Sequence, residues 1–288
     1  MLTRALCLIL AFMVVEVVVG VLANSLALLS DAGHMLTDAA ALGFSLLALR
    51  LAARPAGGAM TFGLRRAEIL SAQGNGITLL ILAAFILYEA IRRLVSPPHV
   101  DGGPMLLVAL AGVLVNLAVI WALSSSERGS LNVEGSFQHV LTDLFAFIGT
   151  AIAAAVIMAT GFERADPIAS LLVSALMLRS AARLLTASAR MFLEAAPPGI
   201  DPAAVGTLLA SQPDIVEVHD LHVWEVSSGF PALSAHVLVA PDSDCHAARR
   251  RLSAVLVERF GISHATLQVD HAPSELLEIE PAPARRVT

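Results

Sequence analysis

One pentapeptide occurs twice in the sequence, and both copies carry side chains that bind metal ions. HMLTD spans residues 34–38 and HVLTD spans residues 139–143, so four of the five positions match. On an α-helix, residues i and i+4 lie on one face about 6 Å apart, so each copy would direct one imidazole and one carboxylate to the same point. Two such helices facing each other offer a tetrahedral set of two nitrogens and two carboxylates, which suits Zn²⁺. The predicted ligands are His34, Asp38, His139 and Asp143.

Both copies lie in long apolar stretches, and the composition explains why. The chain has 288 residues, of which 57% are hydrophobic and 15% are charged, whereas soluble domains have roughly 45–50% apolar and about 25% charged residues. A soluble core of this size cannot bury such an excess, so the bilayer is the expected solvent, and each of six stretches fits the ~20 residues of a spanning helix. The stretches cover residues 5–22, 26–51, 69–91, 105–123, 137–159 and 167–185.

Acidic and imidazole side chains in a membrane need a partner. A lone aspartate at mid-bilayer costs about 2.5–3.5 kcal/mol on insertion scales, and a divalent cation would offset two carboxylate charges. If the two helices begin near residues 24 and 130, each histidine lies ~14 Å along its helix, near the middle of a ~30 Å hydrocarbon core. The alternative is that each His–Asp pair is an internal hydrogen bond that ties the helices together. The repetition of the motif favours the metal site.

The arginines indicate how the helices are oriented. One side carries Arg4, Arg50, Arg54, Arg65, Arg66, Arg128, Arg179, Arg183 and Arg190. The other side carries Arg92, Arg93 and Arg164. Because positive residues gather on the cytoplasmic side, we expect both termini in the cytoplasm.

The last third of the chain differs in charge from the rest. Residues 1–196 hold 12 acidic residues and 12 arginines, for a net charge of zero, while residues 197–288 hold 12 and 6, for a net charge of −6. We therefore expect a six-helix transmembrane domain at 1–196 and an acidic soluble domain at 197–288.

Local signals predict the elements of the cytoplasmic domain. Asp201 is the expected N-cap of a helix with Pro202 at its first position, and Gly261 is expected to end a second helix. The predicted helices cover residues 201–212 and 244–260, and the strands cover 215–226, 233–239 and 264–269. This α-β-β-α-β order suggests a small ferredoxin-like α+β domain.

Longer stretches around both motifs resemble the cation diffusion facilitator family, in its zinc-transporting branch of the bacterial zinc, cobalt and cadmium exporter type. The matching stretches, all within residues 20–270, are NSLALLSDAGHMLTDA, FGLRRAEIL, LYEAIRRLVSPP, NVEGSFQHVLTD and HDLHVWEVSSGFPALSAHVLV. The two pentapeptides are specific when taken together, and DLHVW with SAH is an independent match in the cytoplasmic part.

The resemblance implies a proton-coupled exporter of Zn²⁺, with Co²⁺ and Cd²⁺ as further candidate substrates. It implies a homodimer in the inner (plasma) membrane, with lipid, divalent ions and protons as partners and no nucleic acid. Family members carry the transport site on the second and fifth helices, and histidine at the position of His34 resembles the zinc-preferring pattern. Many zinc-transporting members have a histidine-rich loop between helices four and five, but residues 124–136 contain no histidine. Capture of the ion is therefore expected to fall to other residues.

The resemblance also implies regulatory zinc in the cytoplasmic domain. Matching by motif gives His219, His236, His264 and Asp270 as the regulatory ligands. His219 and His222 are three residues apart on a predicted strand, so we expect them to point to opposite faces and not to bind one ion. The alternative is that these histidines are ordinary surface residues.

Two further acidic residues lie within the apolar stretches. Glu16 is a candidate for the proton path, and the alternative is a packing role in which it hydrogen-bonds a neighbour. Asp31 lies one turn before His34 on the outer side and is a candidate guide for the departing ion. The alternative for Asp31 is that it is the N-cap of the second helix.

Transport is favoured over two other classes of function. Imidazole titrates near pH 6.5, so protons from a more acidic outer space would displace zinc from the site. An intramembrane metal hydrolase usually has three protein ligands and an open position, whereas four ligands would close the shell here. A membrane metal sensor would not need six helices with buried ligands. We therefore expect a transporter and no enzyme.

Overall fold

The computed structural model describes residues 2–124 and 131–273. Within the helices, the side chains outside the description are those of residues 2–11, 38, 41, 42, 45, 49, 121–124 and 131–139. The chain packs as two compact units. The first unit comprises Met1–Arg54 and Ala67–Ser188, and the second comprises Pro55–Arg66 and Ala189–Thr288.

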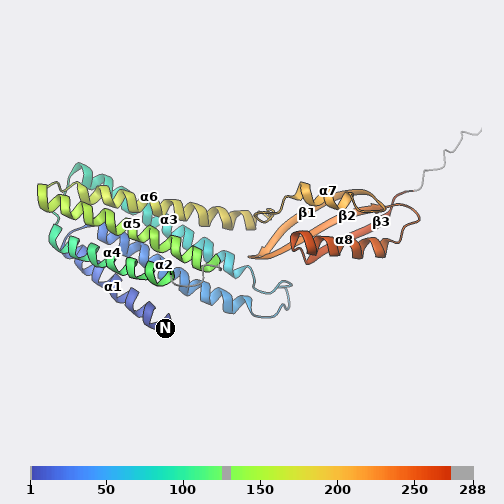
Figure 1. The fold of residues 1–288 in the computed structure, drawn as a ribbon, viewed down its shortest axis with the longest axis horizontal. Coiled ribbons are helices and arrows are strands. Elements are labelled where there is room, and N and C mark those ends of the chain that lie inside the picture. The colour runs from blue at the N-terminus through green and yellow to red at the C-terminus, as the bar shows by residue number, and fades with distance from the viewer. Residues whose placement is uncertain (1, 125–130, 274–288) are drawn as a thin grey trace, which may run out of the picture. The chain divides into compact units, whose positions relative to one another are not determined.

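Six helices build the first unit, and each covers one of the apolar stretches (Figure 1). They are α1 (Leu2–Leu22), α2 (Leu26–Ala52), α3 (Ala67–Val95), α4 (Gly102–Ser124), α5 (Leu131–Thr160) and α6 (Ala165–Phe192). Among the described residues, α3, α6, Gly102–Ile120 of α4 and Val140–Thr160 of α5 are long and apolar enough to cross a membrane. The structure thus supports a helical membrane domain with four clear spans, and spanning by α1 and α2 stays a prediction.

Close packing of small and large side chains holds α4 against α5. Gly112 of α4 lies at the ring of Phe147 on α5, where an added Cβ would be only 2.3 Å from the ring carbons. Small residues at such crossings let membrane helices approach closely, because dispersion contacts rather than water drive their association. Phe147 lies one turn after Asp143, so this contact helps to fix the part of α5 that carries a predicted ligand.

The second unit contains a three-stranded sheet and two helices in the predicted order (Figure 1). Its elements are α7 (Pro202–Ala210), β1 (Ile215–Ser227), β2 (Phe230–Val239), α8 (Cys245–Phe260) and β3 (His264–His271). Strand β2 lies in the middle, antiparallel to β1 and parallel to β3. The cytoplasmic domain therefore has a small sheet, and the ferredoxin-like assignment stays a prediction.

The local signals that delimit these helices act as predicted. The Asp201 side chain accepts a hydrogen bond from the backbone N–H of Ala203, and Pro202 occupies the first helical position. At the end of α8, Gly261 adopts the left-handed conformation with φ of 67°, which L-residues with a side chain rarely adopt.

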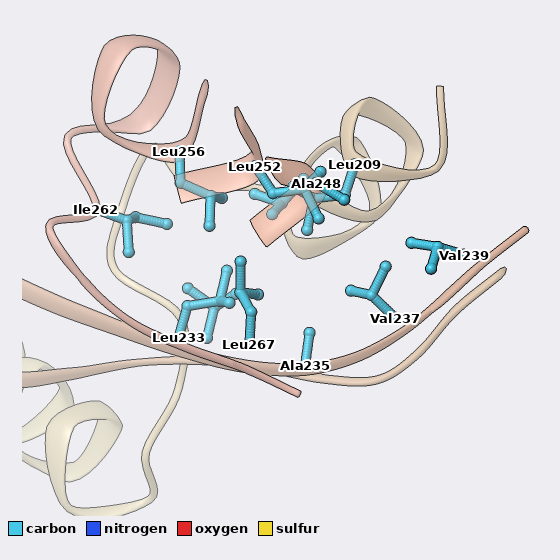
Figure 2. Packing of buried hydrophobic residues seen from close by; sticks show 12 residues of the cluster. Leu209, Leu233, Ala235, Val237, Val239, Ala248, Leu252, Leu256, Ile262 and Leu267 are labelled. Carbon is cyan, nitrogen blue, oxygen red and sulfur yellow. The ribbon is translucent and has the colours of Figure 1, made fainter. Parts of the chain in front are cut away.

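Alternate residues of β2 build the core of the second unit (Figure 2). Leu233, Ala235 and Val237 are at most 1% exposed and face α8, whose Leu252 and Leu256 are fully buried. Because side chains alternate along a strand, the intervening residues of β2 lie on the opposite face of the sheet. That outer face is the one on which His236 lies.

The connection between α2 and α3 belongs to the second unit. The ring centroid of Phe62 lies 5.7 Å from that of His264, and the guanidinium of Arg65 lies 4.7 Å from the centre of the Phe230 ring. The segment Pro55–Arg66 therefore packs at the ends of β2 and β3. From the sequence, this segment was expected to belong with the helices that flank it. The domain boundary at 196/197 stays a prediction.

Candidate metal centre

Residues from the two copies of the pentapeptide meet between α2 and α5. The Nε2 atom of His34 lies 3.9 Å from Oδ1 of Asp143, and their side chains are 11% and 21% exposed. The helices thus bring one member of each copy together, although the two residues are 109 positions apart in the chain. Asp38 and His139 have side chains that lie outside the described residues. Their part in the site therefore stays a prediction from the i, i+4 spacing of the two motifs.

Two threonine hydroxyl groups near these residues form hydrogen bonds within their own helices. The Oγ1 atom of Thr37 donates to the carbonyl oxygen of His34 at 2.7 Å, and Thr150 donates to the carbonyl oxygen of Ala146 at 3.1 Å. Both hydroxyl groups are buried and satisfied within their own helices, so they do not compete for a bound ion.

Glu16 and Asp31 lie beside this contact. Glu16 on α1 is fully buried, interacts with the carboxyl group of Asp31 on α2, and is within electrostatic range of Asp143. Asp31 is 3% exposed and is the sixth residue of α2, so the alternative that it is the N-cap of this helix is wrong. The N-cap position belongs to Ser25, whose hydroxyl accepts a hydrogen bond from the backbone N–H of Leu28 at 3.3 Å.

Three helices therefore contribute ionisable side chains to one buried region. We call Glu16, Asp31, His34 and Asp143 the membrane cluster. Among the residues that the structure describes, no three His, Cys, Asp or Glu side chains are close enough together to hold an ion. The predicted four-ligand set therefore depends on Asp38 and His139. Carboxylates gathered in a medium of low dielectric constant favour binding of a cation or of protons.

A second set of predicted ligands lies on the outer face of the cytoplasmic sheet. His219 of β1 is paired with His236 of β2, and their ring centroids are 5.4 Å apart. Gln268 of β3 is the partner of His236 on the other side, and its amide donates to Asp270 at 2.9 Å. His219, His236 and Asp270 thus share one face of the sheet.

The prediction that His219 and His222 point to opposite faces is wrong. His219 lies opposite His236 and His222 lies opposite Ser234, which are two residues apart and on the same face of β2. The cause is an irregularity in β1 around Asp220, which has a positive φ of 52°. A β-bulge inserts one extra residue and so reverses the alternation of the side chains that follow.

His264 lies apart from the other predicted regulatory ligands. It starts β3, four positions before Gln268, which corresponds to about 13 Å along a strand. Its ring contacts Phe62 and Phe230, with centroids 5.7 Å and 5.6 Å away. Among the described residues of one protomer, His264 therefore lies on the same face of the sheet as His236, but about four residues along the strand from it.

A network of hydrogen bonds that no sequence pattern predicted lies at the end of the bundle where α2 begins. Asp166 of α6 is fully buried and accepts hydrogen bonds from the first residues of α2. Nearby, Glu163 accepts a hydrogen bond from the backbone N–H of Val100 and lies 2.8 Å from Nδ1 of His99. An aspartate in the first turn of an apolar helix suggests a cap for its own helix, so the sequence holds no local sign of a bond to α2.

A bundle of apolar helices with ionisable side chains buried at its centre is typical of a membrane transporter for ions. Comparison with known proteins agrees with this class. The profile described as cation efflux transmembrane domain matches residues 2–193, and that of the cation efflux protein cytoplasmic domain matches residues 197–272. The chain belongs to the cation efflux family.

Curated relatives match over most of the chain. The zinc transporter ZitB of Escherichia coli (strain K12) is 44% identical over 264 residues, which is 91% of this chain and 84% of the relative. The cadmium, cobalt and zinc/H⁺–K⁺ antiporter of Bacillus subtilis (strain 168) is 38% identical over 90% of this chain and 85% of the relative. The metal cation efflux system protein CzcD of Cupriavidus metallidurans is 39% identical over 92% and 84%. This family and these relatives are metal transporters, which confirms the prediction of a transporter rather than an enzyme.

Proposed function

We propose that the chain exports Zn²⁺ from the cytoplasm in exchange for protons, with Co²⁺ and Cd²⁺ as further substrates. The observation that carries the proposal is the 3.9 Å approach of His34 on α2 to Asp143 on α5. The relatives support the choice of ions, because one is a zinc transporter and another is a cadmium, cobalt and zinc/H⁺–K⁺ antiporter.

The proposed transport site consists of His34, Asp38, His139 and Asp143. Two imidazole nitrogens and two carboxylates make four ligands for Zn²⁺, and the two positive charges of the ion offset those of the two carboxylates. Ligands must be deprotonated to bind zinc, so protons compete with the ion for the same atoms. A site open to a more acidic space therefore exchanges zinc for protons, and a site open to the cytoplasm does the reverse.

Glu16 and Asp31 are the proposed proton path of this site. Glu16 is fully buried next to Asp31, and Asp31 lies one turn from His34 on α2. Two carboxyl groups that lie side by side in a water-poor region offer oxygens that can bind either a proton or a cation. The pair can thus pass a proton to or from the region of the ion.

The cytoplasmic domain is proposed to join two chains into a homodimer and to bind regulatory zinc. The outer sheet face with His219, His236 and Asp270 supports this role. His264 is proposed as a further zinc ligand, near the contact between the two cytoplasmic domains of the dimer. With both termini cytoplasmic, as the arginine distribution favours, this domain samples cytoplasmic zinc. In the inner membrane the protein then contacts lipid, metal ions and protons.

Zinc flux into proteoliposomes tests the proposal. Purified protein is reconstituted, a pH gradient is imposed, and zinc movement is followed with an internal dye. Flux that rises with the gradient and disappears when the gradient is collapsed is the expected result. Zinc binding without flux would favour a metal sensor, and zinc-dependent cleavage of a substrate without flux would favour a hydrolase.

A further inference from the structure

Asp166 of α6 holds the start of α2. Its Oδ1 accepts hydrogen bonds from Oγ of Ser25 at 2.6 Å and from the backbone N–H of Ala27 at 3.1 Å, and its Oδ2 accepts one from the N–H of Leu26 at 2.8 Å. The Asp166 side chain is fully buried. One carboxylate thus takes three donors from a helix that lies 140 residues away in the sequence.

These bonds complete the cap of α2. The first backbone N–H groups of a helix have no partner inside the helix. Here Leu26 and Ala27 donate to Asp166, and Leu28 donates to the hydroxyl of Ser25 at 3.3 Å. The negative charge of Asp166 also lies at the positive end of the helix dipole, where it is stabilising.

Arg93 of α3 adds a second tie at the same place. Its Nη1 donates to the carbonyl oxygen of Asn24 at 2.7 Å and lies 4.0 Å from Oδ2 of Asp166. The Arg93 side chain is 14% exposed. The turn before α2 is therefore fixed both to α3 and to α6.

The location of this cap matters because α2 and α5 carry the predicted ligands. A cap made by the helix itself would not constrain α2 relative to α6. Asp166 instead ties α2 to α6, and α6 begins directly after the four-residue connection that follows α5. Ala27 lies seven residues before His34, or about 10 Å along the helix, so rotation at the cap changes the direction of His34 directly.

We propose that Asp166 is a positioning residue for the transported ion: it sets the rotation and depth of α2, and thereby aims His34 and Asp38 at α5. The proposal rests on the proposed transport site. Asp166 itself does not contact the ion. Zinc affinity should therefore depend on whether the carboxylate that caps α2 is attached to α6 or to α2 itself.

The decisive experiment compares two ways of capping α2 in full-length protein in detergent. Asp166→Asn removes the charge and one of the two acceptor oxygens. It should weaken zinc affinity, measured by competition with a fluorescent chelator, roughly tenfold, as for outer partners of metal ligands, and should also lower the thermal unfolding midpoint. Adding Ser25→Asp restores a carboxylate at the N-cap of α2 itself. In the double variant we expect the midpoint to recover while the zinc affinity stays weak.

A purely structural role predicts a different outcome. If Asp166 only stabilises the helix, the double variant recovers both the midpoint and the affinity, which would overturn the proposal. Wild-type affinity in Asp166→Asn would overturn it as well. If Asp166→Asn does not fold, Ser25→Ala removes the hydroxyl bond to Asp166 together with the bond from the N–H of Leu28, and the proposal then requires a smaller but measurable loss of affinity.

Asp101→Asn is the matched control. Oδ1 of Asp101 accepts a hydrogen bond from the backbone N–H of Gly103 at 3.2 Å, so this carboxylate caps the start of its own helix, α4. The same chemical change there should leave zinc affinity unchanged. Failure of the wild-type protein to bind zinc would instead contradict the proposed function, so the two failures are distinguishable.

Discussion

The membrane cluster and the outer face of the cytoplasmic sheet hold the same kinds of side chain in opposite surroundings. In the membrane cluster, the side chains of His34 and Asp143 are 11% and 21% exposed, and Glu16 is fully buried. On the cytoplasmic sheet, the side chains of His219 and His222 are 44% and 65% exposed. The first set lies on helices and the second on strands.

This difference in burial separates two modes of ion binding. A buried carboxylate needs a compensating charge, so we expect the membrane cluster to favour either protons or a cation. An exposed histidine is solvated by water when no metal is bound, so a surface site can fill gradually as the zinc concentration rises. The first mode suits a carrier and the second suits a sensor of concentration.

The largest expected effect comes from removing a membrane ligand. Asp143→Ala or Asp38→Ala should lower zinc flux in proteoliposomes by about 100-fold or more, because loss of a ligand exceeds the effect of losing an outer partner. Insertion and yield should stay near wild type. Asp101→Ala, which removes a carboxylate that caps α4, is the control and should keep its flux. Normal flux in Asp143→Ala would rule out the four-ligand site.

The next effect concerns the choice of metal. His34→Asp exchanges a nitrogen ligand for an oxygen, which suits harder ions such as Mn²⁺ better than zinc. We expect the preference for zinc over Mn²⁺ to fall roughly tenfold, or about 1.4 kcal/mol, in a flux competition series. An unchanged preference would place His34 outside the set of ligands.

A smaller effect is expected on the cytoplasmic sheet. In full-length protein carrying Asp143→Ala, zinc should still tighten the dimer a few-fold, because an ion that binds the dimer preferentially shifts the equilibrium toward it. Replacing His236 and Asp270 by alanine should abolish this response in analytical ultracentrifugation. His99→Ala, which removes an exposed histidine of the first unit, should leave it intact. A response that survives the double replacement would assign no regulatory zinc to this face.

The smallest effect concerns Asp244, the N-cap of α8. The backbone N–H groups of Ala247 and His246 donate to its carboxylate and hold its pKa below the usual range. The resulting stabilisation is complete above the unfolded pKa of about 4 and is lost as the pH falls through the lower folded pKa. Asp244→Ala should therefore lower the thermal midpoint at pH 7 by roughly a few degrees.

The pH dependence provides the check on this explanation. As the pH falls from about 4 through the lower folded pKa, Asp244→Ala and wild type should converge, because the wild-type carboxylate becomes protonated in the folded state as well. Asp242→Ala, two residues earlier and outside the helix, is the control and should change the midpoint less. A difference that stays constant down to pH ~2 would show that the charge of Asp244 contributes nothing.

Local patterns in the sequence predicted the elements well. Apolar runs predicted α1 to α6, because a membrane helix satisfies its backbone within one continuous segment. Asp201 with Pro202, and Gly261, marked helix ends in the second unit, because caps act within a few residues. The repeated His-x-x-x-Asp spacing identified α2 and α5 as partners, since i and i+4 share a face on any helix.

Tertiary structure decided what depends on distant residues. Asp166 caps α2 across 140 positions, and Phe62 meets His264 across 202 positions (264 − 62), so neither contact leaves a local pattern. A single extra residue in β1 put His219 and His222 on one face, against the alternation that the sequence suggested. The sequence by itself determined which segments are helices or strands and which side chains can bind an ion. Only packing decided which of them meet, because long-range contacts depend on the geometry of the whole chain and not on the residues that flank each position.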